Sequence, residues 1–137
     1  MGIVYTEITL KNAIDVGDAD RGYITEKQVR HVTVTAMVDT GAGMLIISEK
    51  VRAALGLNIK GLRQVTLGDN RKEKCKLTEP VEVMWKDRLC NCSALVVPGQ
   101  EGVLLGAIPL EDMDLMVNPA GQELVGAHGD DVVCLVM

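Results

Sequence analysis

The tripeptide Asp39-Thr40-Gly41 places a carboxylate, a hydroxyl and a flexible glycine next to one another, a combination suited to acid–base chemistry. The apolar, β-branched run 31–38 leads into it, and Gly41 and Gly43 permit a tight turn directly after the carboxylate. Burying a carboxylate at the end of a strand costs free energy unless hydrogen bonds or a function offset the loss of water. The neighbouring residues are small, so backbone N–H groups can reach Asp39. The pattern predicts a carboxylate held in a hydrogen-bonded loop, where it can act as a general acid or base.

The cysteines are a second group with potential chemistry. The sequence has four of them: Cys75, Cys90, Cys92 and Cys134. There is no C-x-x-C pair, and we expect buried, reduced thiols because free cysteine is among the most buried residue types. A zinc site would need a further ligand from His31 or His128, and neither has a supporting spacing. We interpret both histidines as surface or core residues and predict no metal and no cofactor, while a metal or redox protein built on the cysteines stays as an alternative.

Charge and composition argue against two classes of partner. The chain has 14 Lys and Arg against 19 Asp and Glu, a net charge of −5, and only 2% aromatic residues. It therefore lacks the basic footprint and the stacking rings of a nucleic-acid binder. Purely apolar runs such as 94–97 are far shorter than a membrane span. No basic-then-apolar leader opens the chain, so we expect a cytoplasmic protein with no membrane contact.

Most of the chain has the two-residue periodicity of β-strands. Its 137 residues are 47% hydrophobic, which suits a single domain over 1–137 with a sizeable core. Strands or apolar strand-like runs are predicted at 3–10, 31–38, 44–47, 62–67, 71–77, 81–85, 88–97, 103–105, 115–117 and 132–136. The periodicity therefore predicts an all-β fold built largely from short antiparallel strands.

Helices and turns are predicted at fewer places. Ser48 is a suitable N-cap for a short helix over Glu49–Leu55 that ends at Gly56, and a second helix is expected around 108–113. The acidic segment Asp15–Gly22 does not fit a calcium loop and is interpreted as a solvated turn. Turns at 68–70 and at 86–87 are predicted to join two β-hairpins.

The stretch Val38-Asp39-Thr40-Gly41-Ala42 resembles the active-site loop of retropepsin-like aspartic proteases. Two further segments fit this resemblance in order and spacing. Val103-Leu104-Leu105-Gly106 stands where the family has two apolar residues and a glycine behind the catalytic loop, and Gly106 follows Asp39 by 67 positions. The segment 65–71 stands where the family has a flap hairpin, with Gly68, Asp69 and Asn70 at its tip. The resemblance covers roughly residues 29–117 and is closest to small bacterial or archaeal members.

This resemblance implies a closed β-barrel of the acid protease type, with one or two short helices, that works as a single-lobe homodimer. The residues it assigns to the site are Asp39 as the catalytic residue, Thr40, Gly41 and Ala42 in its loop, and Leu104, Leu105 and Gly106 behind it. Because the chain has one Asp-Thr-Gly, a homodimer must supply the second Asp39. The two carboxylates would then share a proton and activate water against peptide bonds in extended, apolar-flanked substrates.

The sequence also departs from the retroviral pattern. Gly43 and Ala107 stand where retroviral members often carry an acid and an arginine that form an ion pair. This leaves open a non-catalytic, dimeric peptide-binding module of the same fold. The family interleaves its terminal strands across the dimer, so 3–10 and 132–137 are the segments expected to meet there, together with Thr40.

Overall fold

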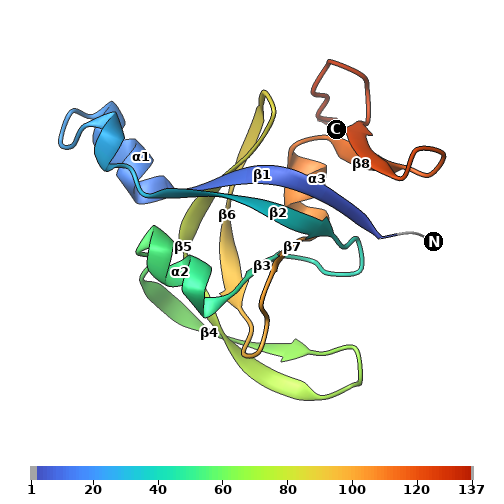
Figure 1. The fold of residues 1–137 in the computed structure, drawn as a ribbon, viewed down its shortest axis with the longest axis horizontal. Helices are drawn as coiled ribbons and strands as arrows, with labels where there is room; N and C mark the ends of the chain where they lie inside the picture. The colour runs from blue at the N-terminus through green and yellow to red at the C-terminus, as the bar shows by residue number, and fades with distance from the viewer. Residues whose placement is uncertain (1–2, 137) are drawn as a thin grey trace.

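The computed structural model describes residues 3–136. Seven of its nine described strands form one large sheet that closes on itself, and the other two form a separate two-stranded sheet (Figure 1). The strands are β1 (Val4–Asn12), β2 (His31–Val38), β3 (Leu45–Ile47), β4 (Ile59–Thr66), β5 (Lys72–Trp85), β6 (Arg88–Val96), β7 (Val103–Leu105), β8 (Leu115–Asn118) and β9 (Glu123–Gly126). The helices are α1 (Ala13–Asp20), the 3-10 helix η1 (Glu26–Gln28), α2 (Glu49–Leu55) and α3 (Ala107–Asp112). No helix in the described part of the chain has the length and apolarity needed to cross a bilayer.

The seven-stranded sheet has the order β1-β2-β7-β3-β6-β5-β4, and an additional pairing of β1 with β5 closes its first six strands into a barrel. β1 and β2 pair antiparallel over their whole length, from Val4 opposite Val38 to Lys11 opposite His31. β7 pairs parallel with β2 and β6 pairs parallel with β3, so segments far apart in sequence meet at the centre. The closed, all-β barrel expected from the resemblance is confirmed.

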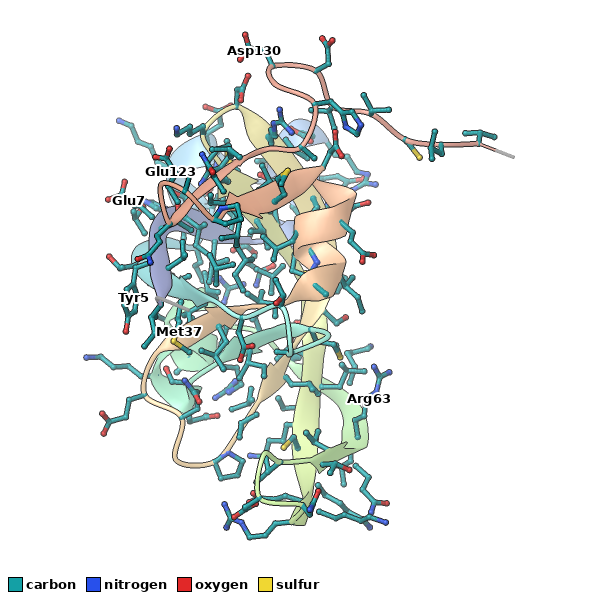
Figure 2. The ribbon with its side chains drawn as sticks, turned by 90° about the vertical axis from the view of Figure 1, so that its right-hand side faces the viewer. Tyr5, Glu7, Met37, Arg63, Glu123 and Asp130 are labelled. Atoms are coloured by element: carbon teal, nitrogen blue, oxygen red, sulfur yellow. The ribbon has the colours of Figure 1, made fainter. Side chains whose placement is uncertain are left out.

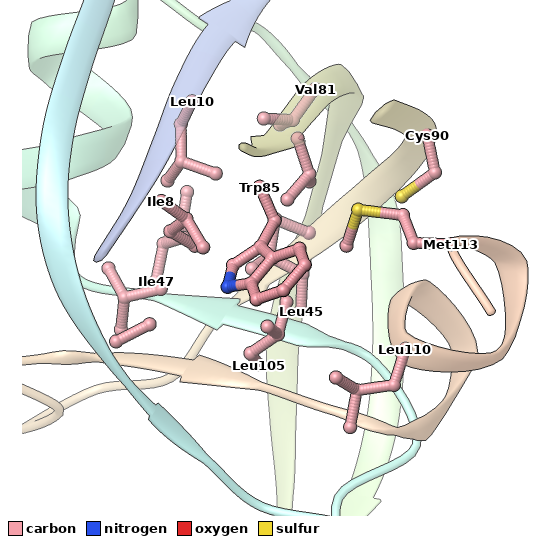
Figure 3. Packing of buried hydrophobic residues seen from close by; sticks show 14 of the residues in the cluster. Ile8, Leu10, Leu45, Ile47, Val81, Trp85, Cys90, Leu105, Leu110 and Met113 are labelled. Atoms are coloured by element: carbon pink, nitrogen blue, oxygen red, sulfur yellow. The ribbon is translucent and has the colours of Figure 1, made fainter. Parts of the chain in front are cut away.

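The barrel interior is filled by aliphatic side chains that alternate along the strands. Ile8, Leu10, Leu45, Ile47 and Leu105 are almost completely buried and belong to one hydrophobic cluster (Figure 3). The single tryptophan also lies in this cluster, and its indole Nε1 donates a hydrogen bond to Thr6 Oγ1 at 2.8 Å. Aliphatic packing thus replaces the aromatic core that a chain without phenylalanine cannot build.

Local signals set the bounds of α2 as predicted. The Ser48 side chain accepts a hydrogen bond from the backbone N–H of Val51 and caps the helix. Gly56 ends it with φ 63°, in the left-handed region where glycine has no Cβ penalty.

The interpretation of Asp15–Gly22 as a solvated turn is wrong, because most of this segment belongs to α1. The Asn12 side chain caps the helix by accepting from the N–H groups of Ile14 and Asp15. Asp15 is buried and forms a two-point ion pair with Arg30, whose backbone N–H also binds the carboxylate. These contacts with a residue 15 positions away stabilise a helix that its own composition, with Gly17 and several aspartates, disfavours.

The prediction of a strand at Val132–Val136 is also wrong within the described residues, and Met137 lies outside them. This segment forms no strand, and Leu135 and Val136 are 86% and 92% exposed. The strand that pairs with β8 is β9, joined to it by the turn 119–122. β-Branched composition favours a strand only where a partner strand is available.

Candidate active site

Asp39 lies directly after β2, in the loop 39–44 that connects β2 to β3. Its backbone N–H donates to the Leu105 carbonyl at 3.0 Å, which fixes the loop to β7. Its Oδ1 accepts a hydrogen bond from the Gly41 N–H at 3.0 Å, and the Ala42 N–H donates to its carbonyl at 3.1 Å. The carboxylate is half-buried rather than buried, while Thr40 and Gly41 are exposed beside it. The result is a carboxylate oriented by the backbone and accessible from one side.

The segment Leu104–Gly106 lies behind this loop. Gly106 packs so closely that a Cβ there would overlap the carbonyl oxygens of Ala42 and Met44. The first residues of α3 add two hydrogen bonds, from Ala107 N–H to the Ala42 carbonyl at 2.8 Å and from Ile108 N–H to the Gly43 carbonyl at 2.9 Å. Backbone hydrogen bonds therefore join the two segments at the positions where retroviral members often carry an ion pair.

Asp39 lies at the edge of a cleft of about 510 Å³. It is lined by the loop and β3, with Met44 and Ile46, and by the end of β4 and the turn that follows it. Four further residues also line it: Leu95, Val97, Gln100 and Leu104. The walls are predominantly apolar, so the cleft suits a chain with apolar side chains.

Two of the residues that line the cleft, Leu95 and Gln100, were not identified from the sequence. Leu95 reaches the cleft because β6 runs parallel to β3, with Leu95 opposite Ile46. Gln100 follows in the loop between β6 and β7. Such a crossover pairing leaves no signal in local periodicity, because both strands simply read as apolar runs.

The predicted flap forms a β-hairpin between β4 and β5, with Thr66 opposite Lys72. Its tip is closed by hydrogen bonds from Leu67 N–H to the Arg71 carbonyl and from Asn70 N–H to the Leu67 carbonyl. Gly68 lines the cleft, whereas Asp69 and Asn70 do not. The Asp69 carboxylate instead pairs with Arg71 at 2.6 Å, and Asn70 takes a left-handed conformation with φ 66°.

The cysteines and histidines lie apart from this cleft's lining. Cys75 and Cys90 are buried, Cys92 is half-buried and Cys134 is exposed, and all four are free. A hydrogen bond to Cys92 and burial raise the pKa of the Cys90 thiol, and burial raises the pKa of Cys75. Within residues 3–136, no three His, Cys, Asp or Glu side chains are grouped so that they could hold a metal ion.

His128, which the sequence indicated only as a surface or core residue, forms a specific contact with Asp114. Its Nδ1 lies 2.7 Å from Oδ2 of Asp114, and the same oxygen accepts a hydrogen bond from the Val133 N–H. These two bonds hold the pKa of Asp114 below its ordinary value, the backbone bond having the larger effect. Asp114 therefore connects the end of α3 to the C-terminal segment.

Comparison with known proteins agrees with this geometry. The family described as gag-polyprotein putative aspartyl protease matches residues 25–122, which is more than half of the chain. The chain belongs to this family of retropepsin-like aspartic proteases. The matched range includes the Asp39 loop, the flap hairpin and the Gly106 segment.

Solved structures share the retropepsin-like fold at low sequence identity. The retroviral protease-like domain of Ddi1 from Leishmania major superposes with a TM-score of 0.54 at 15% identity, covering 91% of this chain and 88% of that one. A retropepsin-like aspartic protease from Rickettsia conorii superposes with a TM-score of 0.52 at 20% identity, covering 85% and 88%. A search of curated proteins by sequence finds no significant match.

Proposed function

We propose that this retropepsin-like protein is an aspartic endopeptidase that acts as a homodimer, with Asp39 of each subunit forming the catalytic pair. The observation that carries the proposal is the Asp39 carboxylate, fixed by the Gly41 N–H at the edge of an apolar cleft. The chain has a single Asp-Thr-Gly, so the second carboxylate has to come from another copy. The exposed side of the loop, with Thr40 and Gly41, is the side from which that copy would approach.

The chemistry of such a pair follows from electrostatics. Two carboxylates close enough to share a proton cannot both be ionised, so one stays protonated. The ionised group removes a proton from a bound water, which attacks the peptide carbonyl. The protonated group donates a hydrogen bond to the oxygen on which negative charge develops. In this scheme the Gly41 N–H and the backbone bonds to Leu105 and Ala107 act by positioning, because they keep each carboxylate fixed.

The substrate that we propose is an extended peptide or protein segment with apolar side chains beside the cleaved bond. Its support is the apolar lining from Met44, Ile46, Val65, Leu95 and Leu104. The hairpin with Gly68, Asp69 and Asn70 at its tip would close over the bound chain and exclude water, as mobile active-site loops do. The four free thiols fit a reducing compartment, so we keep the cytoplasm as the proposed location.

Digestion of a peptide library by wild type and by Asp39→Asn tests this function. The amide is nearly isosteric but cannot act as a base, so we expect cleavage to fall at least a thousandfold while fold and assembly are kept. Asp87→Asn, in the exposed turn between β5 and β6, is a matched control that removes a carboxylate outside the cleft lining and outside the flap and should keep most activity. Equal digestion by wild type and Asp39→Asn would contradict the assignment of Asp39.

A dimeric peptide-binding module without catalysis is the second candidate. The replacement of the ion-pair positions by Gly43 and Ala107 favours it, although backbone bonds take over that contact. The same library separates the two functions: binding of apolar peptides with no cleavage between pH 3 and pH 8 would favour the module.

A further inference from the structure

The charges of this chain are separated in space. Residues 59–77, called here the flap hairpin, hold six Lys and Arg but two Asp and Glu, a net charge of +4. Since the whole chain carries −5, the remainder carries −9. The flap hairpin projects from the lower part of the barrel in Figure 1, away from both marked termini. A basic extension therefore stands out from an acidic body.

Three of these cations lie in a row on one face of the hairpin. Lys72, Lys74 and Lys76 are all exposed and alternate along β5, so their side chains point to the same side, about 7 Å apart from one to the next. The intervening residues point to the opposite side, where Cys75 is buried and Val65, paired with Glu73, lines the cleft. The lysine row is thus on the outer face of the flap hairpin, and only at the tip does this face meet the cleft, where Thr66 opposite Lys72 also lines it.

The facing strand contributes an apolar contact to this outer face. β4 places Leu62, Gln64 and Thr66 opposite Lys76, Lys74 and Lys72. Directly opposed residues of antiparallel strands share a face, so Leu62 lies beside the lysines, and it is 65% exposed. Arg63, labelled in Figure 2, belongs to the other face, and its guanidinium contacts the Sδ of Met44.

The row has no acidic partner within the described residues. The hairpin's one ion pair there joins Arg71 and Asp69 at the tip, and Glu49, the acid that Lys76 influences, is bound to Arg52. Like charges held side by side on a sheet repel one another, and a ligand of opposite charge relieves that repulsion.

We infer that the outer face of the flap hairpin docks an acidic, extended segment of a protein substrate, at a distance from the bond that is cleaved. That the docked segment belongs to a substrate rests on the proposed function; the docking itself does not. The spacing of the lysines matches alternate side chains of an extended polypeptide. A nucleic acid fits less well, because the hairpin has no aromatic residue for base stacking and the acidic body repels a polyanion. The face would select substrates with acidic residues flanking an apolar stretch.

Binding to Asp39→Asn, which should not cleave, tests the docking without catalysis. Two fluorescent peptides share one apolar stretch and differ in a flank of alternating Glu or alternating Gln, and a third carries the Glu flank alone. We expect the Glu flank to tighten binding about tenfold at low salt, the combined effect of three exposed ion pairs. The advantage should shrink as salt increases.

The triple variant Lys72→Glu, Lys74→Glu, Lys76→Glu should abolish that preference and leave binding of the Gln-flanked peptide unchanged. Its matched control, Arg21→Glu, Lys27→Glu, Lys50→Glu, makes the same change of net charge at exposed positions elsewhere and should keep the preference. Equal loss in both variants, or no Glu preference, would overturn the docking site. Lysine-dependent binding of a single-stranded oligonucleotide more tightly than the Glu peptides would overturn the assigned partner.

Cleavage by the wild type separates this inference from the proposed function. Cleavage of both flanked peptides at one rate leaves the endopeptidase standing and removes the docking site. Lysine-dependent binding of the Glu flank with no cleavage of any peptide establishes the docking site and removes the endopeptidase.

Discussion

At the scale of single residues, Asp15 is the clearest case of a charge that stabilises the fold. Its carboxylate is buried and receives three hydrogen bonds from Arg30, two from the guanidinium and one from the backbone. The guanidinium bonds have the largest effect and hold the pKa of Asp15 below its ordinary value, against the opposing effect of burial. A depressed pKa in the folded state means that this stabilisation is present above the unfolded pKa and is lost as pH falls through the folded one.

We therefore predict that Asp15→Asn lowers the free energy of unfolding by roughly 1–2 kcal/mol at pH 7, a modest value because Arg30 is half-exposed. The difference from wild type should begin to shrink as pH falls below about 4, where Asp15 of the unfolded chain binds a proton, and should vanish only below the lowered pKa of the folded state. Urea unfolding at pH 7 and pH 3 measures it. Asp18→Asn, in the same helix, is the control and should change little at either pH. A deficit that persists undiminished at pH 3 would show that packing, not charge, holds α1.

Elements differ in how far they could be predicted from sequence, and α1 and α2 illustrate why. α2 was predicted with its bounds because both end signals, Ser48 and Gly56, are adjacent to it. α1 has an adjacent N-cap in Asn12, but its composition disfavours a helix and its anchor Arg30 lies beyond the next loop, so it was missed. Cleft residues such as Leu95 depend on a parallel crossover between β3 and β6, which likewise has no local signal. Asp39 itself was accessible to sequence reasoning because a loop motif and a supporting glycine are short, local patterns.

The element that supports the Asp39 loop can be tested through Gly106. A Cβ at this position would overlap two loop carbonyls, so Gly106→Ala has to displace either the loop or α3. We predict a loss of about 1–3 kcal/mol in the free energy of unfolding, as for other overpacked sites, and roughly a tenfold or larger loss in kcat/KM. Gly102 lies just before β7, at the opposite end of the strand from Gly106. A Cβ at Gly102 meets no atom within 4 Å, so Gly102→Ala should leave stability and activity nearly unchanged. Thermal unfolding and peptide hydrolysis on both variants check this, and equal behaviour would contradict the support role.

The flap hairpin should be the mobile element over the cleft. From Lys72 to Cys75, β5 has β4 but not β6 as a strand partner, so the hairpin stands out from the barrel as a two-stranded ribbon. We predict fast amide hydrogen exchange at residues 65–73 relative to the β1–β2 pair, and slower exchange with a bound peptide-like inhibitor. An unchanged exchange rate with the inhibitor bound would remove the flap assignment.

At the scale of the whole molecule, the proposed mechanism depends on assembly, because one chain supplies one Asp39. The described structure leaves surfaces that a second copy would cover. β1 pairs with β5 only from Thr9 to Asn12, so its first half has β2 as its single strand partner. The C-terminal segment exposes Val132, Leu135 and Val136 without forming a strand. Apolar segments with free backbone groups of this kind are stabilised by pairing with another strand.

Specific activity per subunit should consequently fall on dilution, in step with the fraction of dimer. Thr40→Ala should weaken the dimer, and deletion of residues 132–137 should weaken it more, because the deletion removes several exposed apolar side chains that a second copy would cover. The deletion also removes the Val133 N–H from Asp114, so Leu135→Ser with Val136→Ser serves as the control that keeps this bond. Analytical ultracentrifugation and peptide hydrolysis over one dilution series measure both quantities. A stable monomer with full, concentration-independent activity would exclude the shared catalytic pair, since a single Asp39 cannot both ionise and keep its proton.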